Sequence, residues 1–114
     1  MAARGEVLAL RRSVGFLPGA ELSRFIVMQT SRLAPVLETV LVIPIDEPVP
    51  DYVKLPGLVP VTAAEAGTRS PQLALATQLT CLALSRFEPA SVGRVRPSTL
   101  AKLDRVLRFV LELP

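Results

Sequence analysis

The sequence has no histidine, no tryptophan, one cysteine and only five aromatic side chains, namely four phenylalanines and one tyrosine. Without histidine, the chain cannot form a histidine-based triad or metal site, and it lacks the usual general base. The single thiol, Cys81, lies in an apolar run and cannot close an internal disulfide, so we expect it to be buried and reduced, as in the cytoplasm. With so few aromatic rings, the core must be aliphatic and built from leucine and valine.

The chain also lacks a segment that fits a signal peptide or a membrane span. Charged side chains interrupt the N-terminal residues. The longest uncharged stretch, Ser70–Ser85, is shorter than the ~20 residues that a span requires, and it contains Pro71. The length of 114 residues predicts one domain, residues 1–114, without membrane association. Half of the residues are hydrophobic, which in so small a chain predicts that some apolar surface is hidden in an oligomer.

Charge is unevenly distributed along the chain, although the net charge is only +3. Residues 1–32 and 69–114 are basic, whereas residues 33–68 carry five acidic residues and one lysine. Two basic segments around an acidic one suit an anionic partner, either a nucleic acid or an acidic peptide. The alternative is a solubilising surface without such a partner.

Apolar runs separated by proline and glycine predict a chain of short strands. We expect strands at residues 7–10, 25–30, 39–45, 58–61 and 92–96. The segments 13–21 and 63–70 are expected to be loops. Residues 73–84 fit both strand alternation and helical spacing, which periodicity alone cannot separate. Pro44 cannot donate a ladder hydrogen bond, so it predicts a sheet edge or the last paired residue of its strand.

The last segment predicts the one clear helix. Pro97 suits a first helical turn, and Asp104 and Arg108 are spaced as an i, i+4 pair on the polar side. One apolar stripe for core or dimer contact comprises Leu100, Leu103, Leu107, Val110 and Leu111. Strands followed by a helix predict a mainly β, α+β fold, in which an antiparallel barrel or sheet carries a packed helix.

The most informative feature is a pair of β-rich runs, Arg24–Ser31 and Thr39–Asp46. An arginine begins the first run, and an acid ends the second. A hairpin-like connection would bring Arg24 and Asp46 to the same edge of a sheet, where a small β protein can place its chemistry. The alternative is a salt bridge across the strand ends, which would contribute little.

Four segments of the chain resemble, in order and spacing, the MazF/PemK family of type II toxin–antitoxin toxins. They are Arg4–Val7, Arg24–Ser31, Thr39–Ile45 and Ser91–Leu113. The resemblance implies an SH3-like antiparallel β-barrel with a C-terminal α-helix. It also implies a cytoplasmic homodimer, a cognate antitoxin peptide, and sequence-specific cleavage of single-stranded RNA without a metal or other cofactor.

The resemblance implies two catalytic positions, here Arg24 and Asp46. The family has threonine or serine at the second position, and proline where this chain has Phe25. Arg24 stays protonated and would stabilise the extra charge of a phosphorane. Asp46 could serve as the base that accepts the 2′-OH proton. Otherwise a hydroxyl of Ser23, Thr30 or Ser31 could supply the missing donor, or activity is lost.

Further residues are predicted to contact RNA, each with a plainer alternative. Arg11 and Arg12 would bind phosphates, or else be solvated strand-end charges. Phe16 and Phe25 would stack a base, or else fill the core. Gln78 would bind a base edge, or else hydrogen-bond to backbone. Thr30 and Ser31 complete the predicted RNA-binding set.

Two other functions remain open. A toxin such as CcdB has the same kind of fold but inhibits DNA gyrase without cleaving RNA. The residues 111–114 do not resemble the aromatic C-terminal tail of such toxins. A catalytically degenerate dimer that still binds antitoxins is the third alternative.

Overall fold

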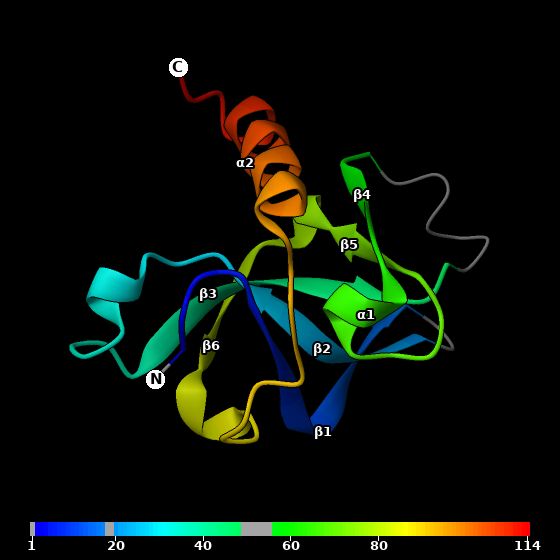
Figure 1. Cartoon of the computed structure of the whole chain (residues 1–114). Helices are drawn as coiled ribbons and strands as arrows, with labels where there is room; N and C mark the ends of the chain where they lie inside the picture. Colours follow the sequence, from blue (N-terminus) through cyan, green and yellow to red (C-terminus); the bar gives the residue numbers. More distant parts are fainter. Residues whose placement is uncertain (1, 18–19, 49–55) are drawn as a thin grey trace.

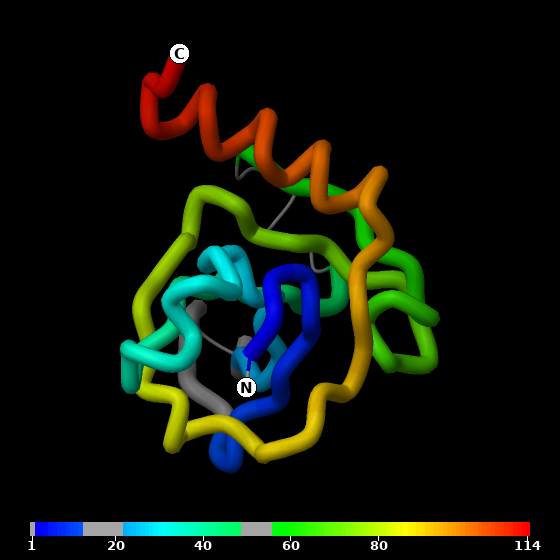
Figure 2. Tube along the Cα trace, turned by 60° about the vertical axis from the view of Figure 1, so that its left-hand side comes forward, coloured from blue at the N-terminus to red at the C-terminus, as the bar shows by residue number. Residues whose placement is uncertain are grey.

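The computed structural model describes residues 2–17, 20–48 and 56–114, without the side chains of residues 13–17 and 20–21. One antiparallel sheet of seven strands curls into a half-barrel (Figure 1, Figure 2). Its strands are β1 (Glu6–Leu17), β2 (Ala20–Val27), β3 (Thr39–Asp46), β4 (Leu58–Val61), β5 (Gln72–Leu75), β6 (Thr80–Ala83) and β7 (Gly93–Arg94). The helices are η1 (Ser31–Leu33), α1 (Ala63–Ala66), η3 (Ala76–Gln78), η4 (Leu84–Arg86) and α2 (Pro97–Val110). The predicted mainly β architecture with a C-terminal helix is confirmed.

Strand β3 is the centre of the sheet, in which the order is β4-β5-β3-β2-β1-β7 and β6 also pairs with β3. On the side away from β2, β3 pairs with β6 as far as Val42 and with β5 from Ile45 onward. Pro44 falls between these two ladders, and it lies opposite Phe25 of β2. A proline without an N–H is tolerated there because no ladder bond is required of it. The prediction that Pro44 marks an edge or the last paired residue of its strand is therefore wrong, since Ile45 and Asp46 are still paired and the proline marks a change of partner strand.

From Val42 to Ile45 both faces of β3 are buried, which explains why this part of the run is apolar without alternation. We name the two faces after adjacent residues of β2. The core on the Phe25 face includes Leu8, Phe25, Val27, Val42, Leu75 and Phe87. The core on the Ile26 face includes Val7, Ile26, Ile43, Ile45, Ala74 and Leu103. Apart from Phe25 and Phe87, these residues are aliphatic, as the composition predicted.

The segment 13–21, expected to be a loop, is largely strand. β1 continues to Leu17 and β2 begins at Ala20, with these two residues paired. The register between β1 and β2 shifts twice, between Ala9 and Val14 and again between Gly15 and Leu17. Bulges absorb such extra residues while the strands stay paired. The glycine in this segment therefore accompanies a bulged hairpin rather than a loop.

The ambiguous segment 73–84 consists of β5, the short helix η3 and β6. Leu73 and Leu75 contribute to the Phe25 face, whereas Ala74 and Ala76 contribute to the Ile26 face, so strand alternation applies and helical spacing does not. Cys81 on β6 is exposed, and it lies opposite the exposed Leu41 of β3. The prediction of a buried thiol is wrong because α2 packs on β4 and η3 and leaves this part of the sheet uncovered.

Helix α2 confirms the predicted C-terminal helix, with Pro97 in its first turn and Arg96 as the N-cap residue. Leu103 is fully buried, but Val110 and Leu111 are exposed because the helix extends beyond the sheet (Figure 1). Asp104 forms its ion pair with Arg4 near the N-terminus rather than with Arg108. No helix of the described residues is long and apolar enough to cross a membrane.

Candidate functional site

Arg24 lies inside a strand rather than at its beginning. It stands opposite Ala9 of β1 and Ile45 of β3, and Ile45 stands opposite Ala74 of β5. Side chains directly opposite each other in a ladder share a face of the sheet. Arg24 therefore belongs to a row of otherwise apolar residues on the Ile26 face. The sheet places a permanently charged group at the border of a hydrophobic core.

The Nε of Arg24 has no hydrogen-bond acceptor. The side chain is half-buried, and its Nε is the one buried polar side-chain atom among the described residues that lacks a hydrogen-bond partner. A buried donor without an acceptor costs about 1–3 kcal/mol. In contrast, Arg4, Arg11 and Arg96 are each paired with a carboxylate. An anion bound beside Arg24 would supply the missing acceptor.

Asp46, the other predicted catalytic residue, is the last residue of β3 and stands opposite Leu73 of β5. Its Oδ1 accepts a hydrogen bond of 2.8 Å from the backbone N–H of Glu47. Because Ile45 shares a face with Arg24, strand alternation places Asp46 on the opposite, Phe25 face. Among the described residues, the ion pairs do not include one between Arg24 and Asp46. The two residues are neighbours in the ladder, but their side chains leave the sheet in opposite directions.

Arg11, predicted to contact phosphate, already has protein partners. Its Nε donates to the carbonyl oxygen of Ser85 at 3.2 Å, and a terminal nitrogen lies 3.7 Å from a carboxylate oxygen of Glu88. Together these residues line one side of a pocket of about 390 Å³ with an apolar floor that includes Phe87. Arg12 is exposed. Arg11 is exposed too, so the two arginines differ in that the ion pairs of the described residues include Arg11 and not Arg12.

Of the two phenylalanines predicted to stack a base, only Phe25 has a side chain among the described residues. Phe25 is 1% exposed and packs edge-to-face on Phe87, with 5.8 Å between ring centroids, so it fills the core. Stacking of a base on Phe25 would require this core to open. The backbone of Phe16 belongs to β1, but its side chain lies outside the described residues.

The remaining predicted residues have local roles away from Arg24. Thr30 caps η1 by accepting a hydrogen bond from the backbone N–H of Arg32, and the hydroxyl of Ser31 accepts one from the backbone N–H of Arg4. Both follow the end of β2, six and seven residues beyond Arg24. Gln78 in η3 donates to the hydroxyl of Thr77. The fold does not gather these residues around Arg24.

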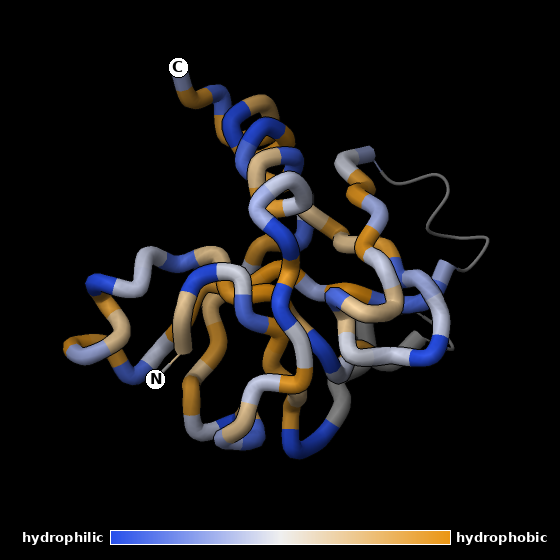
Figure 3. Tube along the Cα trace, viewed as in Figure 1, coloured by the Kyte–Doolittle hydropathy of each residue, from blue (hydrophilic) through white to orange (hydrophobic). Residues whose placement is uncertain are grey.

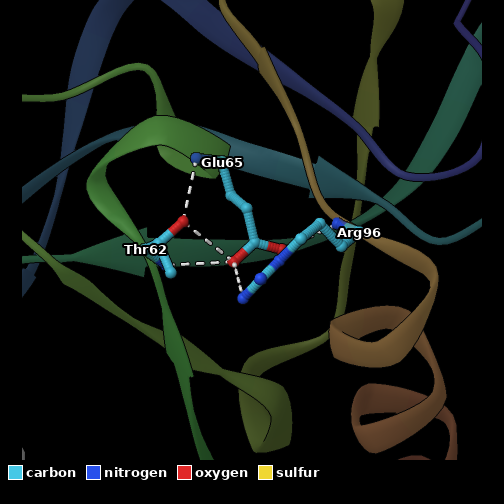
Figure 4. A network of polar contacts seen from close by, with 3 residues as sticks. All are labelled: Thr62, Glu65 and Arg96. Carbon is cyan, nitrogen blue, oxygen red and sulfur yellow. Dashed lines mark hydrogen bonds and ion pairs between the residues drawn. The ribbon is translucent and has the colours of Figure 1, made fainter.

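Sequence reasoning missed a buried carboxylate next to this face of the sheet (Figure 4). The side chain of Glu65 in α1 is 4% exposed. It accepts hydrogen bonds from the backbone N–H groups of Thr62 and Arg96, at 3.1 and 2.7 Å. Burial by itself raises the pKa of Glu65, but these bonds and those from the hydroxyls of Thr99 and Thr62 leave the pKa below its ordinary value.

The missed signal was a capping box. Thr62 and Glu65 have the Thr-x-x-Glu spacing, and the hydroxyl of Thr62 accepts a hydrogen bond from the backbone N–H of Glu65 at 3.1 Å. This pattern begins the short helix α1 inside the segment expected to be a loop. Because Glu65 also bonds to Arg96, the N-cap residue of α2, the carboxylate joins α1 and α2, which both contribute to the core on the Ile26 face.

Two glycines let α1 approach β7. A Cβ on Gly67 would lie 2.0 Å from the carbonyl oxygen of Val92, and a Cβ on Gly93 would lie 2.2 Å from that of Glu65. Gly67 also has φ +70°, the left-handed region that favours glycine. The adjacent Ala66 and Val92 both contact the core on the Ile26 face. Direct backbone packing between α1 and β7, together with Glu65, therefore holds the helices over the Ile26 face, which carries Arg24.

Comparison with solved structures shows what this arrangement is similar to. A mycobacterial endoribonuclease in complex with its cognate antitoxin matches with a TM-score of 0.74 at 16% identity, over 100% of this chain and 98% of that one. The Mycobacterium tuberculosis toxin MazF-mt6 also matches with a TM-score of 0.74 at 16% identity, over 96% and 98%. The MazE–MazF structure of Deinococcus radiodurans matches with a TM-score of 0.73 at 18% identity, over 98% and 97%.

The chain has the fold of MazF toxins. The resemblance stated from the four sequence segments is thus confirmed at the level of the fold, over nearly the whole chain. No protein-family model and no curated protein matches the sequence. At such low identity, the activity of MazF proteins has to be argued for this chain from its own residues.

Proposed function

We propose that this chain is the toxin of a type II toxin–antitoxin module and that it cleaves single-stranded RNA without a metal ion. The observation that carries the proposal is the half-buried guanidinium of Arg24, whose Nε has no hydrogen-bond acceptor. A phosphate of RNA would be that acceptor once the side chain turns outward, because the Nε is buried from solvent in the free protein. Similarity in fold to endoribonuclease toxins supports this choice of anion.

In the proposed reaction, the 2′-oxygen of the RNA attacks its own phosphorus. The 2′-oxygen–phosphorus bond forms and the bond to the 5′-oxygen breaks, and the departing 5′-oxygen takes a proton from water. The products are a 2′,3′-cyclic phosphate and a 5′-hydroxyl. Negative charge accumulates on the phosphorane oxygens. Arg24, fixed in the ladder between β1 and β3, would stabilise that charge in a partly dehydrated setting. This is the role of a preorganised cation, and it requires no proton transfer from arginine.

Asp46 is the proposed proton acceptor, although it leaves the sheet on the other face from Arg24. It is the last residue of β3, so an RNA strand passing around that end of the sheet could reach both groups. A carboxylate there would accept the 2′-OH proton. The substitution Asp46→Thr tests this role, because it introduces the hydroxyl found in the MazF/PemK family. If cleavage is preserved or raised, Asp46 has no chemical role. If cleavage is lost, the result supports Asp46 as the base that accepts the 2′-OH proton.

We also propose a homodimer and a cognate antitoxin as partners in the cytoplasm. The homodimer is supported by a patch of exposed apolar residues around η1 and β3. The patch comprises Leu33, Val36, Leu37 and Leu41. An apolar patch on a small chain marks a surface that another protein chain covers. The antitoxin is supported by the solved complexes of proteins with this fold.

The deciding experiment compares Arg24→Ala with Arg86→Ala, which removes an exposed arginine elsewhere. Purified proteins are incubated with a mixed single-stranded RNA in EDTA, and the new ends are sequenced. We expect the wild type and Arg86→Ala to produce 5′-hydroxyl ends, and Arg24→Ala to produce about 10²–10³ times fewer. Equal cleavage by Arg24→Ala would refute Arg24 as the phosphate contact.

The replacement of a hydroxyl by Asp46 favours a second candidate, a degenerate dimer that binds antitoxin without cleaving RNA. An ionised carboxylate near the phosphate would repel it rather than donate a hydrogen bond. This candidate is supported if the wild type cleaves none of the RNAs tested and still binds an antitoxin when the two are expressed together. A CcdB-like inhibitor would instead arrest growth without 5′-hydroxyl RNA fragments.

A further inference from the structure

The end of β3 carries a second carboxylate, which the proposed reaction does not use. Glu47 directly follows Asp46, where the tube along β3 changes from hydrophobic to hydrophilic colours (Figure 3). Its side chain is exposed. Successive residues of an extended chain alternate between the two faces of a sheet, so we expect Glu47 on the same face as Ile45, which stands opposite Arg24. Glu47, unlike Asp46, therefore belongs to the side of the sheet that carries Arg24.

A contact with the segment before β5 agrees with this placement. The hydroxyl of Ser70 donates a hydrogen bond to Oε1 of Glu47 at 3.3 Å. Ser70 lies two residues before Gln72, and Gln72 stands opposite Val61, which belongs to the core on the Ile26 face. Residues two apart in an extended chain share a face, so Ser70 and Glu47 meet on this face.

Ser70 is itself held in place by two side chains. The hydroxyl of Thr68 and the amide of Gln72 donate to its carbonyl oxygen, at 2.8 and 3.1 Å. Gln72 is 5% exposed, so this chain of hydrogen bonds begins in the core and ends at the exposed carboxylate of Glu47. A surface glutamate loses rotamer freedom when it binds a ligand, which has an entropic cost. An anchored carboxylate has lost part of that freedom beforehand, which favours binding.

One oxygen of this carboxylate is available to a ligand. Oε1 of Glu47 accepts from Ser70, whereas no described residue donates to Oε2 or forms an ion pair with Glu47. Each carboxylate oxygen has two lone pairs, so Oε1 can accept a second hydrogen bond. The group can therefore accept two parallel N–H donors, but it repels a phosphate. Beside an arginine that holds phosphate, the part of RNA that suits a carboxylate is a base.

The spacing of the two side chains suits one nucleotide. Glu47 is the diagonal neighbour of Arg24 in the extended ladder, because Ile45 stands opposite Arg24 and Glu47 follows two residues later. Diagonal neighbours on one face lie about 7–8 Å apart, within reach of long side chains. A nucleotide whose phosphate meets the arginine can therefore present its base to the carboxylate.

Of the four RNA bases, only guanine presents two adjacent N–H donors on its Watson–Crick edge, at N1 and N2. Adenine and cytosine present one amino group beside an acceptor nitrogen, and this acceptor would face a carboxylate oxygen. Uracil presents one N–H between two carbonyl oxygens. Single-stranded RNA exposes these edges, because its bases can be splayed out of the stack. A carboxylate at this position therefore favours guanine and disfavours the other three bases.

We propose that Glu47, anchored by Ser70, is a specificity-determining residue that binds the Watson–Crick edge of a guanine next to the phosphate held by Arg24. The inference rests on the proposed RNA cleavage, and it names a base beside which that cleavage occurs. Cleavage should therefore require guanine at one fixed position. Asp46 remains the proposed proton acceptor on the other face.

Deoxyoligonucleotides separate base recognition from cleavage, because they lack the attacking 2′-OH. The whole chain is titrated with fluorescein-labelled strands of about nine nucleotides that hold one guanine in a run of uracil, and anisotropy gives Kd. In two matched strands, adenine replaces the guanine, or hypoxanthine does, which removes only the N2 donor. We expect the wild type to bind the guanine strand at least about tenfold more tightly than either of the others.

Glu47→Gln keeps the size of the side chain but turns one acceptor into a donor. We expect the guanine preference to fall to within about twofold, because an amide matches the adjacent donor and acceptor of adenine instead. Glu38→Gln, which changes an exposed glutamate just before the other end of β3, should retain the wild-type preference. Ser70→Ala should lower the preference less than Glu47→Gln, since it removes the anchor and not the acceptor. Arg24→Ala should weaken binding of all three strands by a similar factor.

Two results overturn the proposal. They are equal binding of the guanine and hypoxanthine strands by the wild type, which includes no binding of either, and a guanine preference that survives Glu47→Gln. Sequencing of the RNA ends tests the proposed function separately. Cleavage without guanine at a fixed position refutes the base contact and leaves the nuclease, whereas guanine-selective binding without cleavage supports the base contact and refutes the nuclease. Because Glu47 is exposed, Glu47→Gln should leave the circular dichroism spectrum unchanged.

Discussion

Arg24 and Glu65 are two charged side chains beside the same hydrophobic core, and their surroundings are opposite. Glu65 is almost completely buried, yet backbone N–H groups and hydroxyls meet its oxygens. Arg24 is less buried, yet its Nε has no acceptor. A satisfied buried charge belongs to the architecture, whereas an unsatisfied one is a candidate contact for a ligand. Burial alone would therefore not separate the architectural residue from the one proposed to bind RNA.

The largest expected effect separates activity from stability at Arg24. Arg24→Ala should lower RNA cleavage about 10²–10³-fold. It should leave the free energy of unfolding unchanged or raise it by up to about 1 kcal/mol, because an unsatisfied donor disappears. Urea denaturation of the two proteins, monitored by circular dichroism, provides the second measurement. A large loss of stability in Arg24→Ala would mean that this arginine is structural and that the contrast with Glu65 is false.

Glu65→Ala should have the opposite effect, a loss of stability with little change in RNA cleavage. It leaves the backbone N–H groups of Thr62 and Arg96 without their acceptor, and should lower the free energy of unfolding by about 2 kcal/mol. Cleavage per folded molecule should change little, since Glu65 contacts no RNA in the proposed site. Glu88→Ala, which removes an exposed ion-pair partner, is the control and should cost less than about 1 kcal/mol. Equal costs for both variants would contradict the assigned role of Glu65.

Gly67→Ala should destabilise the chain by about 1–3 kcal/mol, because the residue has a left-handed backbone and its new Cβ would meet the carbonyl oxygen of Val92. Gly5→Ala is an informative partner variant. Gly5 also has positive φ, but the nearest atom to its new Cβ is 3.7 Å away. The difference between the two variants in thermal unfolding isolates the close approach of α1 and β7. No difference would mean that this backbone contact is dispensable.

The smallest effect is a pH dependence. Folding lowers the pKa of Glu65 below its ordinary value of 4.5, so the folded state favours the ionised carboxylate. Its stabilisation is present above pH 4.5 and is lost as the pH falls through the lower pKa of the folded state. Glu65→Gln should therefore lose less stability than the wild type between neutral pH and that acidic range. The free energy of unfolding of both proteins is measured by denaturation at each pH. An equal loss for the two proteins over this range would contradict the linkage.

The accuracy of sequence reasoning differed between local and non-local features. The run at β3 and the helix beginning at Pro97 were predicted within a residue or two, because apolar spacing and a proline in the first turn are local signals. The bulged hairpin of β1 and β2 was missed, since the extra residues matter only relative to a partner strand. Cys81 was predicted to be buried because it lies in a run of apolar residues. Such a run does not indicate which part of the sheet a helix will cover.

For the candidate site, the sequence indicated Arg24 through its position in a family-like strand, but it could not indicate the state of the guanidinium. Hydrogen-bond satisfaction depends on atoms of β1 and β3 that are distant in the chain. The same dependence separated Asp46 from Arg24. The two residues lie close together in the ladder, but a register that pairs Arg24 with Ile45 sends the next carboxylate to the other face.

The sequence by itself determined the mainly β fold with its closing helix, because strand and helix periodicities are written into short stretches of apolar residues. It also determined which chemistry is impossible without histidine. Tertiary structure alone decided which charges are satisfied, which face each side chain occupies and which apolar residues stay in water. These properties are relations between segments far apart in the chain, and their free energies arise only when the segments meet.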